Sequence, residues 1–138
     1  MSWIINVINA VTNLYGVRAM LLPVMTPLGK FLTLSAIITS IFNHLGEVNK
    51  HGLPGIYPFN LHLNLYLNLD RIAAISLMVH TILTRNIVDT ILHTPYPYIA
   101  LLSLILSDTI RPKKPHPYLF FHTIWHILAF HCLYLTYA

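Results

Sequence analysis

The sequence predicts an all-α fold, a polytopic transmembrane helix bundle of about five spanning helices. Eight basic and four acidic residues make up only 9% of the 138 residues, against about 25% in typical soluble domains. Hydrophobic residues make up 56% of the chain and its mean hydropathy is +0.65, so charged side chains are too few to cover a water-soluble globule. At about 20 residues per span, we expect one transmembrane domain over residues 1–138.

Proline and glycine residues separate the apolar segments that define the expected helices. These segments are residues 3–22, 28–47, 62–85, 96–110 and 117–137. The connection at 23–30 is short, so the first two helices form an antiparallel hairpin, whereas 47–60 is the longest loop. The fourth segment is short for a span, and we expect it to be tilted or sheltered by its neighbours.

Net charge argues against a nucleic-acid partner. The formal charge of +4 comes from scattered Lys and Arg residues, and the longest basic run is Lys113-Lys114. Nucleic-acid binding instead needs a clustered basic surface. The expected solvent and partner is therefore the lipid of a membrane, in which the nine histidines need a partner or a function.

Two pairs of residues are spaced so that both side chains lie on one helix face, one turn apart. Ser40 and His44 lie near the end of the second helix, and His122 and His126 lie near the start of the fifth. Two histidines at this spacing can bind one metal ion. A third histidine from another helix completes the three-ligand set of a catalytic zinc.

Topology supports the convergence of these residues. Counting spans places the C-terminal end of the second helix (His44), the N-terminal end of the third (Asp70) and the N-terminal end of the fifth (His122, His126) at the same membrane face. Each residue lies one to two turns inside its helix end, about 5 to 10 Å below the interface. Together with Ser40, which lies one turn from His44, these side chains make five polar groups that can meet at one depth.

The motifs also resemble those of the CREST superfamily of membrane hydrolases, which includes alkaline ceramidases and the adiponectin and progestin receptors. The resemblance lies in the order Ser-x3-His, then Asn-Leu-Asp at 68–70, then His-x3-His in a last helix that reads HTIWHIL. It implies that zinc is the cofactor and that a lipid amide or ester is hydrolysed, and it favours an endomembrane location. The implied zinc ligands are His44, His122 and His126, with Ser40 and Asp70 as catalytic neighbours.

The resemblance also implies a shortened bundle. Family members have seven spans, with three helices between the Asp helix and the His-x3-His helix where this chain has one. Removing two spans preserves the parity that brings the metal residues together. The smaller bundle leaves room for a homo- or hetero-oligomeric partner that completes its cavity.

Two other functional classes fit the same histidines. A haem- or quinone-binding subunit of a respiratory complex would use two histidines from different helices, such as His80 and His126. A non-catalytic receptor or structural protein of the family would keep the metal only to hold its helices together. The plainest alternative is that the histidines join helices by hydrogen bonds.

Overall fold

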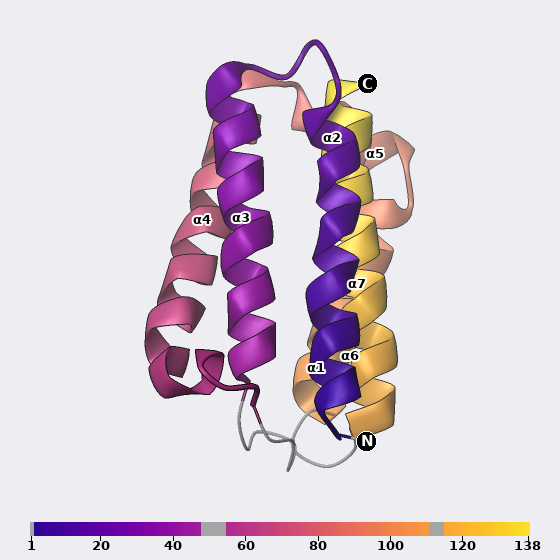
Figure 1. Ribbon diagram of the computed structural model, residues 1–138. Coiled ribbons are helices and arrows are strands. Elements are labelled where there is room, and N and C mark those ends of the chain that lie inside the picture. The colour runs from indigo at the N-terminus through magenta and orange to yellow at the C-terminus, as the bar shows by residue number, and fades with distance from the viewer. Residues whose placement is uncertain (1, 48–54, 111–114) are drawn as a thin grey trace.

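The regular structure of the described residues, 2–47, 55–110 and 115–138 of a computed structural model, is helical throughout (Figure 1). The five expected helices are confirmed to within about three residues at each end, and the first is divided into three segments. The structure adds one short helix that the sequence analysis placed in a connection, α5. In chain order the elements are α1 Ser2–Thr12, the 3-10 helix η1 Asn13–Gly16, α2 Val17–Met20, α3 Pro27–Gly46, the 3-10 helix η2 Phe59–His62, α4 Leu63–Thr84, α5 Ile87–His93, α6 Tyr96–Ile110 and α7 Pro115–Tyr137.

Helix α3 has a well-defined start at a sequence signal. The Thr26 hydroxyl accepts a hydrogen bond from the backbone N–H of Gly29 at 3.0 Å, and Pro27 occupies the first helical position. Both features favour a helix start: Thr26 gives a partner to a backbone donor of the first turn, and Pro27 has no N–H that would need one. Half of the predicted loop at 47–60, residues 48–54, lies outside the described part of the chain.

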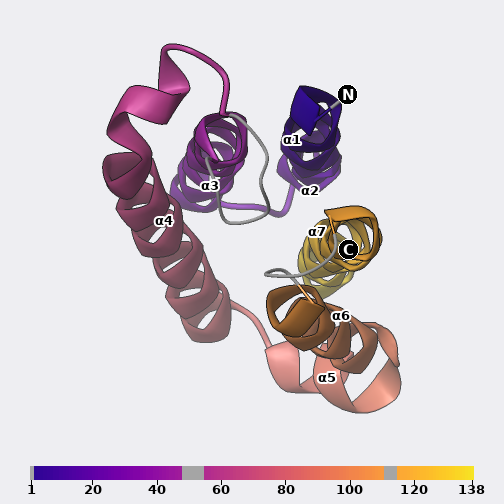
Figure 2. The ribbon, with the colours of Figure 1, turned by 90° about the horizontal axis from the view of Figure 1, so that it is seen from below.

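The helices form an open arc (Figure 2). Following the arc, α4 packs on α3, α3 on α1, α1 on α7, and α7 on α6. Helix α1 therefore bridges the two halves of the bundle, one built from α3 and α4 and the other from α6 and α7. The N-terminal ends of α4 and α7 and the C-terminal end of α3 lie at the same end of the bundle (Figure 1), as the topology predicted.

The expected number of membrane spans, five, is wrong for the described helices. Two helices are long and apolar enough to cross a membrane, Pro27–Gly46 and His116–Tyr137. A third span results if Phe59–Thr84 and Ile87–His93, which are bent by 97° at their junction, are counted together. The fourth expected span, α6, has only 15 residues, fewer than the roughly 17 that a span requires.

The first expected span is interrupted by a 3-10 turn. The Thr12 hydroxyl and the Asn13 amide both donate to the backbone carbonyl of Asn9, at 2.8 and 3.0 Å. Side chains that bond to nearby carbonyls in this way compete with the regular helical ladder. The competition accounts for the change to 3-10 geometry at Asn13–Gly16, a change that length and hydropathy do not predict.

The apolar core lies at the end of the bundle away from the histidines. Small side chains allow close helix approach there, as is common in membrane proteins. Large apolar side chains on the outer faces are exposed on all the longer helices, as expected for contact with lipid. The core cluster consists of Ala19, Met25, Ala36, Ala73, Leu77, Leu133 and Tyr137.

Gly16, at the end of η1, packs closely against α7, and it provides a test of the packing. A Cβ atom at this position would lie 2.6 Å from the ring of Phe130. We expect Gly16→Ala to lower the free energy of unfolding in detergent by about 1 to 2 kcal/mol, because overpacking costs about 1–3 kcal/mol and the gain in helix propensity returns only about 0.5–1.

Adding Phe130→Leu to Gly16→Ala should recover most of the loss, measured against Phe130→Leu alone by thermal unfolding. Equal stability of Gly16→Ala and the parent protein would contradict this packing.

Candidate metal centre

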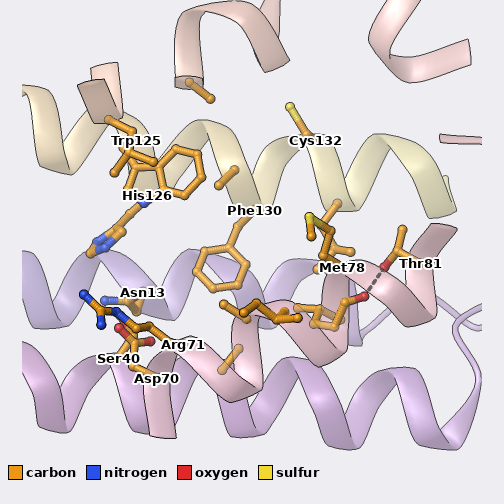
Figure 3. Close-up of a pocket in the computed structure, with 18 of the residues that line it drawn as sticks. Asn13, Ser40, Asp70, Arg71, Met78, Thr81, Trp125, His126, Phe130 and Cys132 are labelled. Atoms are coloured by element: carbon orange, nitrogen blue, oxygen red, sulfur yellow. Dashed lines mark hydrogen bonds between the residues drawn. The ribbon is translucent and has the colours of Figure 1, made fainter. Parts of the chain in front are cut away.

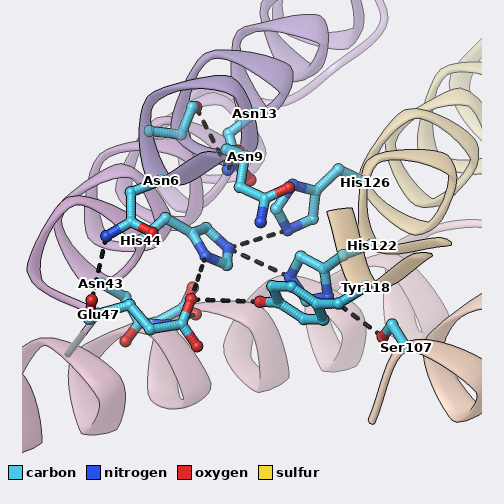
Figure 4. Close-up of polar contacts among 12 residues, drawn as sticks. Asn6, Asn9, Asn13, Asn43, His44, Glu47, Ser107, Tyr118, His122 and His126 are labelled. Carbon is cyan, nitrogen blue, oxygen red and sulfur yellow. Dashed lines mark hydrogen bonds and ion pairs between the residues drawn. The ribbon is translucent and has the colours of Figure 1, made fainter. Parts of the chain in front are cut away.

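Three buried imidazoles meet inside the bundle at the end where α3 stops and α7 starts (Figure 4). His44 comes from α3, and His122 and His126 come from successive turns of α7; they are 4%, 8% and 5% exposed. His44 Nε2 lies 3.2 Å from His126 Nε2 and 3.3 Å from His122 Nε2. The predicted convergence of these three histidines is confirmed.

The other ring nitrogen of each imidazole faces an oxygen atom. His126 Nδ1 lies 2.8 Å from Thr12 Oγ1, and His122 Nδ1 lies 3.3 Å from Ser107 Oγ. Thr12 and Ser107 each donate their only hydroxyl proton to a backbone carbonyl at 2.8 Å, so they act as acceptors toward the imidazoles. His44 Nδ1 lies 3.5 Å from Glu47 Oε2, which as a carboxylate oxygen also accepts.

These partners determine the tautomers. With each Nδ1 carrying the proton, the Nε2 lone pairs of His126 and His122 face the Nε2 atom of His44, at 3.2 and 3.3 Å. Converging lone pairs repel unless a cation lies between them. The same pattern, an oxygen partner on one ring nitrogen and an unprotonated second nitrogen, is found in metal-ligating histidines.

The separations of the Nε2 atoms also fit a metal ion. Two ligands of a tetrahedral ion with metal–nitrogen bonds of about 2.0–2.1 Å lie about 3.3 Å apart. The two measured separations, 3.2 and 3.3 Å, agree with this value. We conclude that the three buried histidines can hold a metal ion with little movement of their side chains.

Acidic residues are concentrated at this site. Of the four in the chain, Glu47 and Asp70 lie beside the histidines. Glu47 is 4% exposed, and its carboxylate also accepts a hydrogen bond from the hydroxyl of Tyr118 at 3.2 Å. Two carboxylates beside three neutral imidazoles form a site with the negative charge that a divalent cation needs.

Ser40 and Asp70 lie on the opposite wall of the cavity from His126 (Figure 3). Ser40 is buried one turn before His44, and the half-buried Asp70 accepts a hydrogen bond from Asn43 Nδ2 at 3.2 Å. Ser40, His44 and Asp70 line the same cavity as His122 and His126. The structure thus brings together the five polar residues that the sequence singled out, while their catalytic roles stay a prediction.

The cavity has a volume of about 590 Å³ and extends from the histidines along the bundle. On α7 its lining runs from Tyr118 and His122 to Thr136, and His122 and Thr136 are about 21 Å apart at 1.5 Å per residue. Beyond the histidine end the wall is mostly apolar, with Leu77, Met78, Leu104, Phe130 and Leu133 among its residues. It is a long apolar cavity with one polar end.

Sequence reasoning missed two groups of residues at the site. One is Glu47, which the sequence analysis took only as the start of a loop, although an acid three residues after His44 lies on the same helix face. The other is the buried stripe of Asn6, Asn9 and Asn13 on the inner face of the first helical segment. Their i, i+3, i+7 spacing on an apolar helix was the signal that could have revealed them.

The structure does not bring together the pair expected for a haem site. His80 Nε2 lies 3.0 Å from the hydroxyl of Thr26, near the start of α3, whereas His126 contacts His44 and Thr12. In addition, the Nε2 atom of His44 lies only 3.2 and 3.3 Å from those of His126 and His122, which leaves no space for a porphyrin between them. The geometry favours a bare metal ion over haem.

Comparison of the chain with protein-family models, with curated proteins and with solved structures gives no match.

The metal site predicts a pattern of zinc binding among histidine variants. Purified protein should contain about one zinc per chain by elemental analysis, and His44→Ala, His122→Ala and His126→Ala should each lose it because two imidazoles bind the ion too weakly. His80→Ala, which changes another intrahelical histidine, should retain the metal. Zinc-free protein with a Soret absorption band would favour haem instead.

Proposed function

We propose that this protein is an integral membrane, zinc-dependent hydrolase that cleaves an amide or ester bond of a lipid. The observation that carries the proposal is the joint presence of three metal-competent histidines, a serine and an aspartate at the polar end of one long apolar cavity. A purely structural metal would need neither the cavity nor the two additional polar side chains.

Zinc held by three neutral imidazoles supplies a Lewis acid that polarises a carbonyl group and lowers the pKa of water to about 7. The side chains around the site complement that chemistry. Asp70 is placed to hold a water molecule and accept its proton, because its carboxylate faces the cavity beside His44. The three Nδ1 atoms face Glu47, Ser107 and Thr12, which supports this role over the orientation of an imidazole.

Ser40 is placed to stabilise the oxyanion of the substrate. Its side chain is buried one helical turn from His44 and lines the cavity. A hydroxyl that donates a hydrogen bond to the developing negative charge contributes about 2.7–4 kcal/mol in comparable sites. The buried setting strengthens this contact because little water competes for the donor.

The shape of the cavity favours a lipid substrate. An acyl chain fits an apolar cavity about 21 Å long, and its carbonyl group would then lie at the histidine end. The helices that form the walls are exposed to the bilayer on their outer faces. Both α4 and α6 contribute residues to the cavity wall, so a lipid of the surrounding bilayer is the natural source of substrate.

The resemblance to the CREST hydrolases supports the same assignment of residues. It also explains the open arc, because the helices that this chain lacks relative to the family would lie between the Asp helix, α4, and the His-x3-His helix, α7. A second copy of the chain or another membrane subunit is the natural means of completing this wall.

Two variants test catalysis separately from metal binding. Ser40→Ala and Asp70→Asn should retain about one zinc per chain but lower kcat by about 10²- to 10³-fold, because each removes stabilisation of the transition state and leaves the three ligands intact. Release of fatty acid from ceramide and phospholipid panels by detergent-solubilised protein gives the rate.

Matched controls with the same chemical change are available elsewhere in the chain. Ser35→Ala removes a serine hydroxyl on α3 that donates to the carbonyl of Phe31, and Asp89→Asn removes an exposed carboxylate on α5. Both should leave turnover unchanged. Zinc-loaded parent protein that is inert on every lipid would reject the hydrolase in favour of a receptor or structural role.

A further inference from the structure

We propose that Glu47 is a positioning residue of the metal centre: it orients the His44 imidazole and supplies buried negative charge for a divalent ion. The inference rests on the metal-dependent function proposed above, and it assigns a role to a residue outside the set of histidines, serine and aspartate. It is carried by the contacts that join Glu47 to three helices.

The backbone of Glu47 is held from two sides. Its N–H donates to the carbonyl of His44 and closes the end of α3, and its own carbonyl accepts a hydrogen bond from Asn6 Nδ2 of α1 at 3.0 Å. Gly46, the residue before it, packs closely on η2, because a Cβ atom there would lie 2.6 Å from the backbone oxygen of Phe59. The backbone of Glu47 is thus fixed by contacts with α1 and α3 and follows a closely packed residue.

The side chain of Glu47 is consequently held inside the bundle. Its Oε2 atom accepts from the hydroxyl of Tyr118 on α7 at 3.2 Å and lies 3.5 Å from His44 Nδ1 (Figure 4). Tyr118 is 1% exposed and lies one turn before His122. One carboxylate thus connects the imidazole donated by α3 with the helix that donates the other two.

Charge supplies the second part of the argument. The carboxylate of Glu47 is 4% exposed and lies beside the His44 imidazole and the Tyr118 hydroxyl. A carboxylate that accepts a hydrogen bond from one nitrogen of an imidazole makes the other nitrogen a stronger metal ligand. Its negative charge also favours a divalent ion on the far side of the His44 ring.

The test compares metal affinity among variants that change this charge or its contacts. Glu47→Gln keeps the size of the side chain and removes its charge, and it should weaken zinc binding by about 10- to 100-fold, the usual effect of losing such a partner. Glu47→Asp should recover part of this loss. Asp89→Asn removes the same charge from an exposed site and should bind zinc as the parent does.

Affinity is measured by competition with a chromophoric chelator, and cobalt substitution reports ligand geometry through its visible absorption. Tyr118→Phe keeps the ring and removes only the hydroxyl, so it should weaken binding by less than Glu47→Gln. Thermal unfolding of the zinc-free proteins separates a loss of affinity from a loss of fold.

Equal zinc affinity of Glu47→Gln and the parent would overturn the inference, as would an equal loss in Asp89→Asn. If Glu47→Gln does not fold, unchanged affinity and an unchanged cobalt spectrum in Tyr118→Phe overturn it. Zinc binding that depends on Glu47 in a protein inert on lipids would support the inference and reject the hydrolase, and a parent protein that binds no zinc would reject both.

Discussion

The meeting of three imidazole lone pairs inside an apolar bundle is the constraint on which the rest of the structure depends. His44 belongs to one half of the arc and His122 and His126 to the other, so the two halves must be held at the separation that one ion requires. Helix α1 provides this separation by packing between α3 and α7. Its half-buried Thr12 and its buried Asn6 contact the site directly, through His126 and Glu47.

Each metal-competent histidine is oriented by an oxygen atom from a different element: α1, α3 and α6 through Thr12, Glu47 and Ser107. This arrangement makes the site a junction of the whole bundle and not a property of α7 alone. It also places the polar groups at one end, while the cavity beyond them is lined by apolar side chains. A low-dielectric wall next to a charged centre strengthens the electrostatic effects on which hydrolysis depends.

Sequence analysis succeeded for the helices that are long and uninterrupted, because proline, glycine and capping residues mark their ends. It failed on the number of spans for reasons that lie in local hydrogen bonding and tertiary contacts. Thr12 and Asn13 interrupt the first segment by bonding to the carbonyl of Asn9, and the chain bends by 97° after α4 to form α5. Hydropathy averages over a window and does not respond to either feature.

At the candidate site, too, some features follow from the sequence and others only from the tertiary structure. The sequence by itself determined an all-α apolar chain and placed His44, His122 and His126 at one end of it, because helical periodicity and span parity need no tertiary information. Only the tertiary structure revealed Glu47, Tyr118, Thr12 and Ser107 as their partners, and it alone showed the long cavity beside them. These features depend on the distances between helices that are remote in the sequence, and such distances are set by side-chain packing across the whole bundle.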